Sequence, residues 1–368
     1  MCIRDSVKDA RRSMQRVYNL GFFDDVNMKL NPGEDPNGVV LETSVVERRT
    51  GTFSVGAGYS DADGLMGIIE VGDTNFRGIG DAVKIHWEFG GDADTYDNYE
   101  FSYTRPWLDK KQTSASFRVY DRTHEYDHYN TDGHLVETYD KNYKGYELSF
   151  GRPQSEFSTN FITFKDRTDK YVEHVSGTNQ PQEKPGWLED NFGKTRSITL
   201  AHVTDTRDNV YNPTEGARVS LSGEFSGFLG GDFDYDKYIF EDRHYFKVGR
   251  AHVIATRATV GYANGSMPEA ALFDAGGQNS LRGYEDDQFR GNKMVLGTVE
   301  YRFPIASKVS GAVFTDFGNA WSEGKDIPTI HKSVGVGVQL ETPIGPIRLD
   351  YGRGEDGGKT HFSFGGSF

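Results

Sequence analysis

The sequence predicts an all-β protein, a 16-stranded antiparallel transmembrane β-barrel preceded by a partial α+β domain. From residue 51 onward, apolar and polar residues alternate in about sixteen runs, and no helical pattern interrupts them. No apolar stretch is long enough to form a membrane-spanning helix, but barrel strands need apolar residues only at alternate positions. Connections between the runs also tend to alternate between long and short, which is typical of membrane barrels.

The composition narrows the class of protein further. The chain contains 20 Tyr and 25 Phe, and this aromatic content excludes a disordered protein. Its net charge of −14 argues against nucleic-acid binding, because phosphates require a basic surface. A single Cys excludes a disulfide framework.

The N-terminal part differs from the rest of the chain. Residues 1–6 (MCIRDS) resemble a translated sequencing adapter, and we expect them to be an artefact. In residues 7–48, apolar residues at helical spacing are followed by two alternating segments around a turn, as in the back end of a small α+β module. We expect the barrel to comprise residues 49–368. No signal peptide opens the chain, so an exported protein would have a further segment upstream.

The two faces of the predicted strands differ in polarity. Val334, Val336 and Val338 alternate with small or polar residues, and we expect the apolar positions to face lipid. Other alternate positions carry charges that lipid would not tolerate, and these predict the side facing the lumen; they are Glu300, Arg302, Arg348 and Asp350. A soluble β-sandwich with one wet face is the alternative, but sixteen uninterrupted runs would make a very large one.

Connection lengths predict the orientation of the barrel. Long connections are expected after odd-numbered runs, at 121–142, 169–194, 226–235 and 264–292. Short turns are expected after even-numbered runs, at 77–80, 152–155, 304–307 and 342–345. An even number of strands returns both ends of the barrel to the short-turn side, which predicts that segment 7–48 lies in the periplasm.

Two motifs suggest an arrangement inside the barrel. The loop before the twelfth run contains Leu281-Arg282-Gly283-Tyr284, and the thirteenth run contains Asp316 in an Asp-x-Gly pattern. Both motifs resemble those of the BamA family of outer-membrane assembly factors, with Leu281 in place of the usual Val or Ile. The resemblance implies that the loop folds back into the lumen and that Arg282 contacts Asp316. A bidentate pair would satisfy an Arg that is brought into a lumen.

Two further segments carry the same resemblance. The turn motif Asp205, Arg207, Asp208 and Asn209 resembles the family's turn between the eighth and ninth strands, and residues 343–352 resemble its penultimate hairpin. Segment 7–48 is similar to the end of a POTRA domain.

The resemblance implies a function in assembling outer-membrane proteins. Unfolded outer-membrane proteins would be the clients, accessory outer-membrane lipoproteins and the lipid bilayer would be the other partners, and the bacterial outer membrane would be the location. The first and last strands would pair weakly and open as a lateral seam, where clients add by β-augmentation. The expected seam residues are Phe53, Val55, Gly56, Gly58, Phe362, Phe364, Gly365, Gly366 and Phe368.

The terminal aromatic residues Phe362, Phe364 and Phe368 also resemble the signal that such assembly factors read in their clients. The resemblance implies no enzymatic activity, no cofactor and no metal. A TamA-like factor, a two-partner secretion transporter and a porin are the alternative functions.

Three local patterns resemble chemical sites and are rejected. His124 and His128 match His-Glu-x-x-His, but we expect them in a loop, whereas a zinc site needs both on one helix face. Residues 357–360 fall short of a phosphate-binding loop because Arg353 stands where its first Gly is required. The alternating Asp232, Asp234 and Asp236 lack the Gly and Glu of a calcium loop, so a solvated acidic loop is expected.

Overall fold

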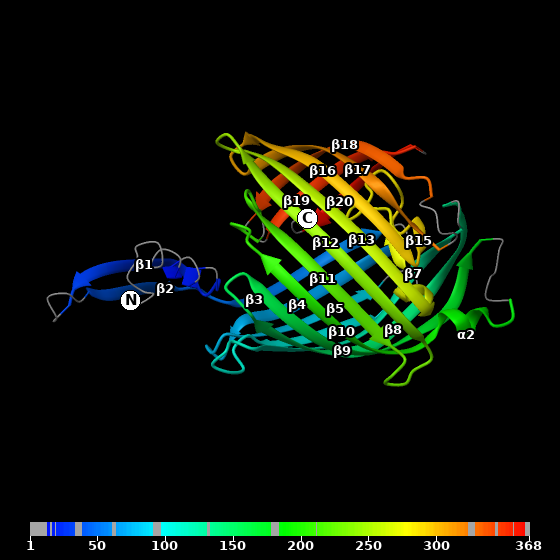
Figure 1. Ribbon diagram of the computed structural model, residues 1–368, viewed down its shortest axis with the longest axis horizontal. Coiled ribbons are helices and arrows are strands. Elements are labelled where there is room, and N and C mark those ends of the chain that lie inside the picture. The colour runs from blue at the N-terminus through cyan, green and yellow to red at the C-terminus, as the bar shows by residue number, and fades with distance from the viewer. Residues whose placement is uncertain are drawn as a thin grey trace.

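The computed structural model of the chain (Figure 1) describes residues 13–14, 17–18, 20–33, 39–60, 64–90, 97–130, 133–177, 184–210, 212–322, 328–342, 345–355 and 357–364. Residues 1–6 lie outside the described residues, as do Gly365, Gly366 and Phe368 of the expected seam.

Sixteen strands form one sheet in which every neighbouring pair is antiparallel, and Figure 1 shows this sheet curled into a barrel, so the predicted fold class is confirmed. Its strands are β3 (Gly51–Ser60), β4 (Gly64–Phe76), β5 (Asp81–Gly90), β6 (Asp97–Arg105), β7 (Ser114–Tyr129), β8 (Leu135–Pro153), β9 (Ser158–Ser176), β10 (Gly193–Asp205), β11 (Gly216–Ser226), β12 (Asp234–Val248), β13 (His252–Ser266), β16 (Lys293–Ala306), β17 (Val309–Trp321), β18 (His331–Thr342), β19 (Gly345–Arg353) and β20 (Gly358–Phe364).

The strands follow one another round the barrel in chain order, and among the described residues only one connection carries strands of its own. Between β13 and β16, the chain forms the short 3₁₀ helix η2 (Glu269–Ala271) and a separate two-stranded sheet of β14 (Phe273–Ala275) and β15 (Phe289–Gly291). The helix α2 (Trp187–Asn191) lies between β9 and β10. Within the described ranges, no helix combines the length and the apolar character needed to cross a bilayer.

The alternating pattern separates the two faces of the sheet as expected. The side chains of Val334, Val336 and Val338 are exposed on the outside of β18. The side chains of Glu300, Arg348 and Asp350 are buried. A β-strand directs successive side chains to opposite faces, so this pattern gives the barrel an apolar outer surface and a charged lumen.

The predicted long loop at 121–142 is wrong. Strand β7 continues to Tyr129, and β8 begins at Leu135, so the connection is only a short turn. The two strands remain paired, with Tyr126 opposite Tyr139. This extension carries charged and aromatic residues on both faces, so the apolar alternation that marks lipid-facing strands is absent. His124 and His128 therefore lie on a strand, where an extended backbone separates positions i and i+4 by about 13 Å.

Ahead of the barrel, β1 (Phe23–Pro32) and β2 (Val39–Glu47) pair as an antiparallel hairpin outside the 16-stranded sheet, shown in blue in Figure 1. Residues 13–14 and 17–18 are helical. The hairpin lies at the end of the barrel opposite β15 and α2 (Figure 1). The assignment of residues 7–48 to a POTRA domain stays a prediction.

Candidate functional site

The connection between β13 and β16, residues 267–292, forms the lumen loop. Arg282 in this loop is only 2% exposed. Its guanidinium donates two parallel hydrogen bonds to Asp316 on β17, from Nε to Oδ2 at 2.7 Å and from Nη2 to Oδ1 at 2.9 Å. The backbone N–H of Arg282 donates to the same carboxylate at 3.1 Å. The structure thus brings together the two residues that the sequence motifs had paired.

Arg282 belongs to a larger group of buried and half-buried charges, the lumen charge cluster, which consists of Arg282, Glu300, Arg302, Asp316, Arg348 and Asp350. The Nη1 atom of Arg282 donates to Glu300 at 2.8 Å and to Asp350 at 3.3 Å. Arg348 donates to the carboxylate of Glu300 at 2.6 Å and to the carboxylate of Asp350 at 2.8 Å. Arg302 donates to Glu300 at 2.7 Å.

Three guanidinium groups and three carboxylates make the formal charge of the lumen charge cluster zero. Charges removed from water are tolerated only when they are paired and hydrogen-bonded. The ring of Phe314 lies 3.3 Å from the Arg282 guanidinium carbon and adds a cation–π contact. The cluster therefore holds the middle of the lumen loop against β16, β17 and β19.

Gly283 lets the backbone of the lumen loop approach the barrel wall. Its φ of +98° lies in the left-handed region, and a Cβ there would stand 2.9 Å from the carbonyl carbon of Gly352 on β19. The N–H of Gly283 donates to Nε2 of His361 on β20 at 3.1 Å. The motif glycine thus connects the loop to the last strand of the sheet.

Leu281 and Tyr284 fix the loop through different contacts. Leu281 is buried in an apolar cluster that includes Phe273 and Leu296. The hydroxyl of Tyr284 donates to the carbonyl of Lys332 at 3.1 Å and accepts the N–H of Glu355 at 3.2 Å. All four residues of the motif therefore make contacts that position the loop in the lumen.

Sequence reasoning placed Glu300, Arg302, Arg348 and Asp350 in the lumen without joining them to Arg282. Their signal was charge at inward alternate positions of two separate stretches of the chain, residues 300–302 and 348–350. That signal predicts which face of the sheet each charged side chain lies on, but it does not predict the residue with which the side chain pairs. The contact of His361 with the loop had no signal in the sequence, because a single His on a strand has no spacing pattern.

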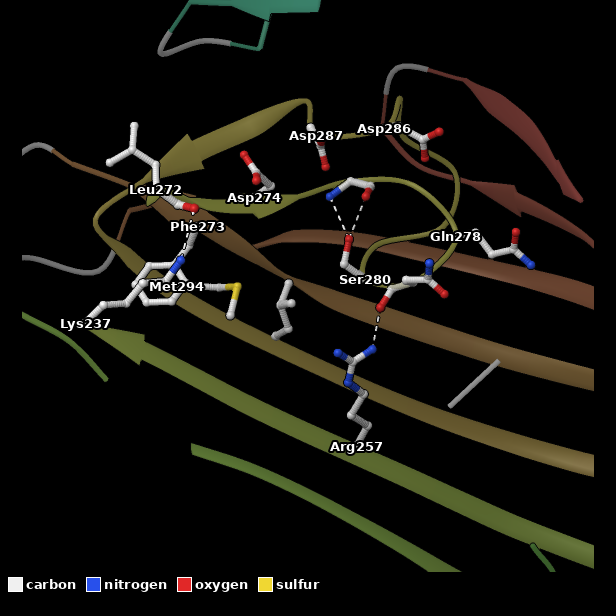
Figure 2. Close-up of a pocket in the computed structure, with 13 residues that line it drawn as sticks. Lys237, Arg257, Leu272, Phe273, Asp274, Gln278, Ser280, Asp286, Asp287 and Met294 are labelled. Carbon is white, nitrogen blue, oxygen red and sulfur yellow. Dashed lines mark hydrogen bonds between the residues drawn. The ribbon is translucent and has the colours of Figure 1, made fainter. Parts of the chain in front are cut away.

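A cavity of about 580 Å³ lies between the lumen loop and strands β12, β13 and β16 (Figure 2). Figure 2 shows Lys237 and Arg257 pointing from the barrel wall to the loop. Lys237 Nζ donates to the carbonyl of Ala271 at 2.7 Å, and Arg257 donates to the carbonyl of Asn279. Because these two cations bind loop carbonyls, the cavity is best described as space left by the docked loop.

The turn motif lies between β10 and β11, the eighth and ninth strands of the sheet. Arg207 donates two hydrogen bonds to Asp205, at 2.9 and 2.6 Å. The Asp208 carboxylate accepts the N–H groups of Asn209, Thr214 and Glu215 at 2.8–3.2 Å, and the hydroxyl of Thr214 at 2.6 Å. Asn209 accepts the N–H of Asn212 at 3.1 Å. These side chains close the turn by satisfying backbone donors.

The hydrogen bonds to Asp208 also change its acidity. Burial opposes ionisation, but the Thr214 hydroxyl and the backbone N–H groups outweigh this effect, so the pKa of Asp208 is lowered. Because the pKa is lowered, the hydrogen bonds to the Asp208 carboxylate stabilise the folded protein above the unfolded-state pKa. This contribution is lost as pH falls through the folded-state pKa.

We expect Asp208→Ala to lower the free energy of unfolding by about 1 kcal/mol at neutral pH, because the turn loses the acceptor of several hydrogen bonds. The difference in unfolding free energy between Asp208→Ala and the unmodified protein should become smaller in acid, because the Asp208 carboxylate is then protonated. Denaturant titration of the protein in phospholipid vesicles measures it. Glu215→Ala in the same turn removes an exposed side chain and is the control. Equal effects of the two changes would contradict the role of Asp208.

The expected seam lies between the two edge strands of the sheet, β3 and β20. Among the described residues, these strands share no backbone ladder. The side chains of Phe53 and Phe362 are 71% and 64% exposed, and that of Val55 is also exposed. Gly56 and Gly58 lie within β3, and Phe364 ends β20.

The Omp85 superfamily domain matches residues 75–368. The outer membrane protein assembly factor BamA of Nitratidesulfovibrio vulgaris is 26% identical over 392 residues, which cover 97% of this chain and 47% of that protein. The chloroplastic outer envelope protein 80 of Arabidopsis thaliana is 26% identical over 399 residues, which cover 98% of this chain and 51% of the relative. The chain thus spans about half the length of these curated relatives.

Solved structures show the same fold. BamA from Haemophilus ducreyi lacking POTRA domains 1–3 matches with a TM-score of 0.69 and 20% identity, covering 99% of this chain and 79% of that one. CdiB from Acinetobacter baumannii matches with a TM-score of 0.64 and 16% identity, covering 96% of this chain and 67% of that one. With the family match extending over most of the sequence, the chain belongs to the Omp85 superfamily and is a β-barrel of the bacterial outer membrane.

Proposed function

We propose that this chain forms the barrel of a BamA-type assembly factor, which folds and inserts β-barrel proteins through the lateral seam between β3 and β20. The observation that carries the proposal is the pair of edge strands without a shared ladder among the described residues. The superfamily membership supports outer-membrane protein assembly or Omp85-type transport as the broader function.

The physical reason lies in the backbone groups of an incoming strand. Unpaired N–H and C=O groups are costly in lipid, so a strand cannot enter the bilayer alone. An exposed sheet edge offers these groups partners while the strand is at the membrane. Hydrogen bonding and burial then drive the reaction, so the proposed function needs no cofactor and no catalytic step.

The proposed partners follow from this mechanism. Unfolded outer-membrane proteins would be the clients, and accessory outer-membrane lipoproteins would complete the assembly complex. The β1–β2 hairpin would lie in the periplasm as part of a POTRA domain and would receive extended clients at its strand edges. A TamA-like factor would use the same seam for other clients.

A secretion transporter or a porin would use the lumen instead of the seam. The lumen loop and the lumen charge cluster lie inside the barrel, which favours the seam as the working part. A water-filled diffusion channel would have no need of a loop fixed by six buried or half-buried charges.

A disulfide across the seam tests the proposal. We expect Ser54→Cys with Ser363→Cys, in a background with Cys2→Ser, to stop client insertion when oxidised and to restore it on reduction. The assay measures insertion of an unfolded outer-membrane barrel into liposomes that contain the protein, by its heat-modifiable electrophoretic mobility.

The matched control joins two strands that are already paired. Ser310 on β17 lies opposite Gln339 on β18, so a disulfide between Cys residues at these positions adds a covalent link without closing the seam. Full client assembly by the seam-locked barrel would rule out the proposed mechanism.

A further inference from the structure

The ends of the lumen loop contact the barrel wall at a second place, on β7 and β8, whereas the lumen charge cluster lies against β16, β17 and β19. Glu269 in η2 is 5% exposed, and its carboxylate accepts three hydrogen bonds. The donors are Nδ1 of His128 on β7 at 2.7 Å, the hydroxyl of Tyr139 on β8 at 2.9 Å, and Nη1 of Arg290 in the loop itself at 2.9 Å. Two of these three bonds therefore join the loop to β7 and β8.

Further contacts join the same two parts of the molecule. Gln288 of the lumen loop donates from Nε2 to the carbonyl of Gly133, in the turn between β7 and β8, at 3.2 Å. The guanidinium carbon of Arg290 lies 4.4 Å from the ring centre of Tyr126 on β7. These contacts lie at the end of the barrel away from the N-terminal hairpin, where Figure 1 places β15.

The topology makes this link a connection across the interior. The lumen loop begins on β13 and ends on β16, whereas its partners lie on β7 and β8. On one path round the barrel, the four strands β9 to β12 separate β8 from β13. On the other path lies the seam between β20 and β3. The link therefore ties the N-terminal part of the wall to the C-terminal part.

We propose that Glu269, His128 and Tyr139 form a brace across the lumen that restrains opening of the seam. A cylinder that is open along one line widens by unrolling, and unrolling moves opposite walls apart. A link between those walls opposes this motion. The inference rests on the proposed seam, and it assigns Glu269 and its two partners as positioning residues for seam opening.

The wall itself offers a matched control. Glu137 on β8 is also buried, and it accepts a hydrogen bond from Nδ1 of His174 at 3.0 Å and from the hydroxyl of Tyr171 at 3.2 Å. His128 and His174 have the same side-chain exposure, 25%. Both donors to Glu137 come from β9, so these two hydrogen bonds lie within one wall and do not involve the lumen loop, although the ring of Tyr171 stacks on that of Tyr139 with the ring centres 5.0 Å apart.

The experiment compares two double variants of the whole protein in liposomes. His128→Phe with Tyr139→Phe removes both wall donors of the brace and keeps the ring contacts. His174→Phe with Tyr171→Phe makes the same chemical change around Glu137. Spin labels on Cys at Val55 and Phe362, both exposed positions, in a background with Cys2→Ser, report the width of the seam by double electron–electron resonance.

We expect the brace variant to raise the ratio of wide to narrow seam about a hundredfold, because it removes two hydrogen bonds to a charged group and the loss of each is worth about tenfold. The Glu137 variant should keep the distance distribution of the unmodified protein. A wide population that rises equally in both variants, or in neither, overturns the brace.

The single variant Tyr139→Phe keeps the test decisive if the double variant does not fold, because it removes only one hydroxyl oxygen. It should widen the seam to a smaller degree, and an unchanged distribution would count against the brace. Client insertion is not the readout. Failure of the proposed assembly function, which the seam disulfide tests, therefore remains distinguishable from failure of the brace.

Discussion

Replacing Arg282 by alanine is expected to destabilise the barrel by about 3–5 kcal/mol, because the change leaves buried carboxylates without their common partner. Asp316 loses both side-chain hydrogen bonds of the bidentate pair, and Glu300 and Asp350 each lose one. The measurement is denaturant-induced unfolding of the protein in phospholipid vesicles, followed by tryptophan fluorescence.

Two further variants show whether the positive charge of Arg282 or the bidentate geometry of its guanidinium stabilises the barrel. Arg282→Lys keeps the charge but cannot form the bidentate pair, so its effect should be intermediate. Arg250→Ala, in the exposed turn after β12, removes an Arg of the barrel without touching the lumen. An Arg282→Ala barrel as stable as the Arg250→Ala barrel would show that the lumen charge cluster does not hold the loop.

Glu300→Gln is expected to have a comparable effect, of about 3–5 kcal/mol, although it changes neither the size nor the shape of the side chain. Glu300 accepts hydrogen bonds from Arg282, Arg302 and Arg348. A neutral amide would leave three guanidinium groups facing two carboxylates and would turn its own N–H₂ group toward donors.

The same unfolding measurement checks this prediction, with the heat-modifiable mobility of the folded barrel as a second readout. Glu173→Gln on the exposed face of β9 is the matched control. If Glu300→Gln and Glu173→Gln unfold at the same denaturant concentration, the carboxylate charge of Glu300 contributes nothing to the barrel.

The barrel could be predicted from the sequence because lipid imposes a strict alternation on its outer face. Runs such as Val334, Val336 and Val338 cannot shift by one residue without turning polar groups to lipid. Where β7 and β8 continue beyond this requirement, both faces carry charged and aromatic residues. The alternation disappears there, and the predicted loop at 121–142 was wrong for that reason.

The candidate site was predictable only in part. The Arg282 motif and Asp316 each lie in a recognisable local pattern, so their resemblance to a family gave the contact. The contacts of Glu269 with His128 and Tyr139 join residues 141 and 130 positions apart. Neither Glu269 nor Tyr139 lies in such a pattern, and the His-Glu-x-x-His match of His128 points to a metal site rather than to this contact. Pairing across a lumen depends on the curvature and register of the whole sheet, which no short segment encodes.

The contacts of Arg282 have a consequence for the order of folding. Its carboxylate partners lie 18, 34 and 68 residues further along the chain, on three different strands. Closing such long loops is slow and gains nothing until the partners are in place. The guanidinium can therefore leave water only after β16, β17 and β19 have taken their places in the sheet. Burial of this side chain is accordingly a late step in folding of the C-terminal half of the barrel.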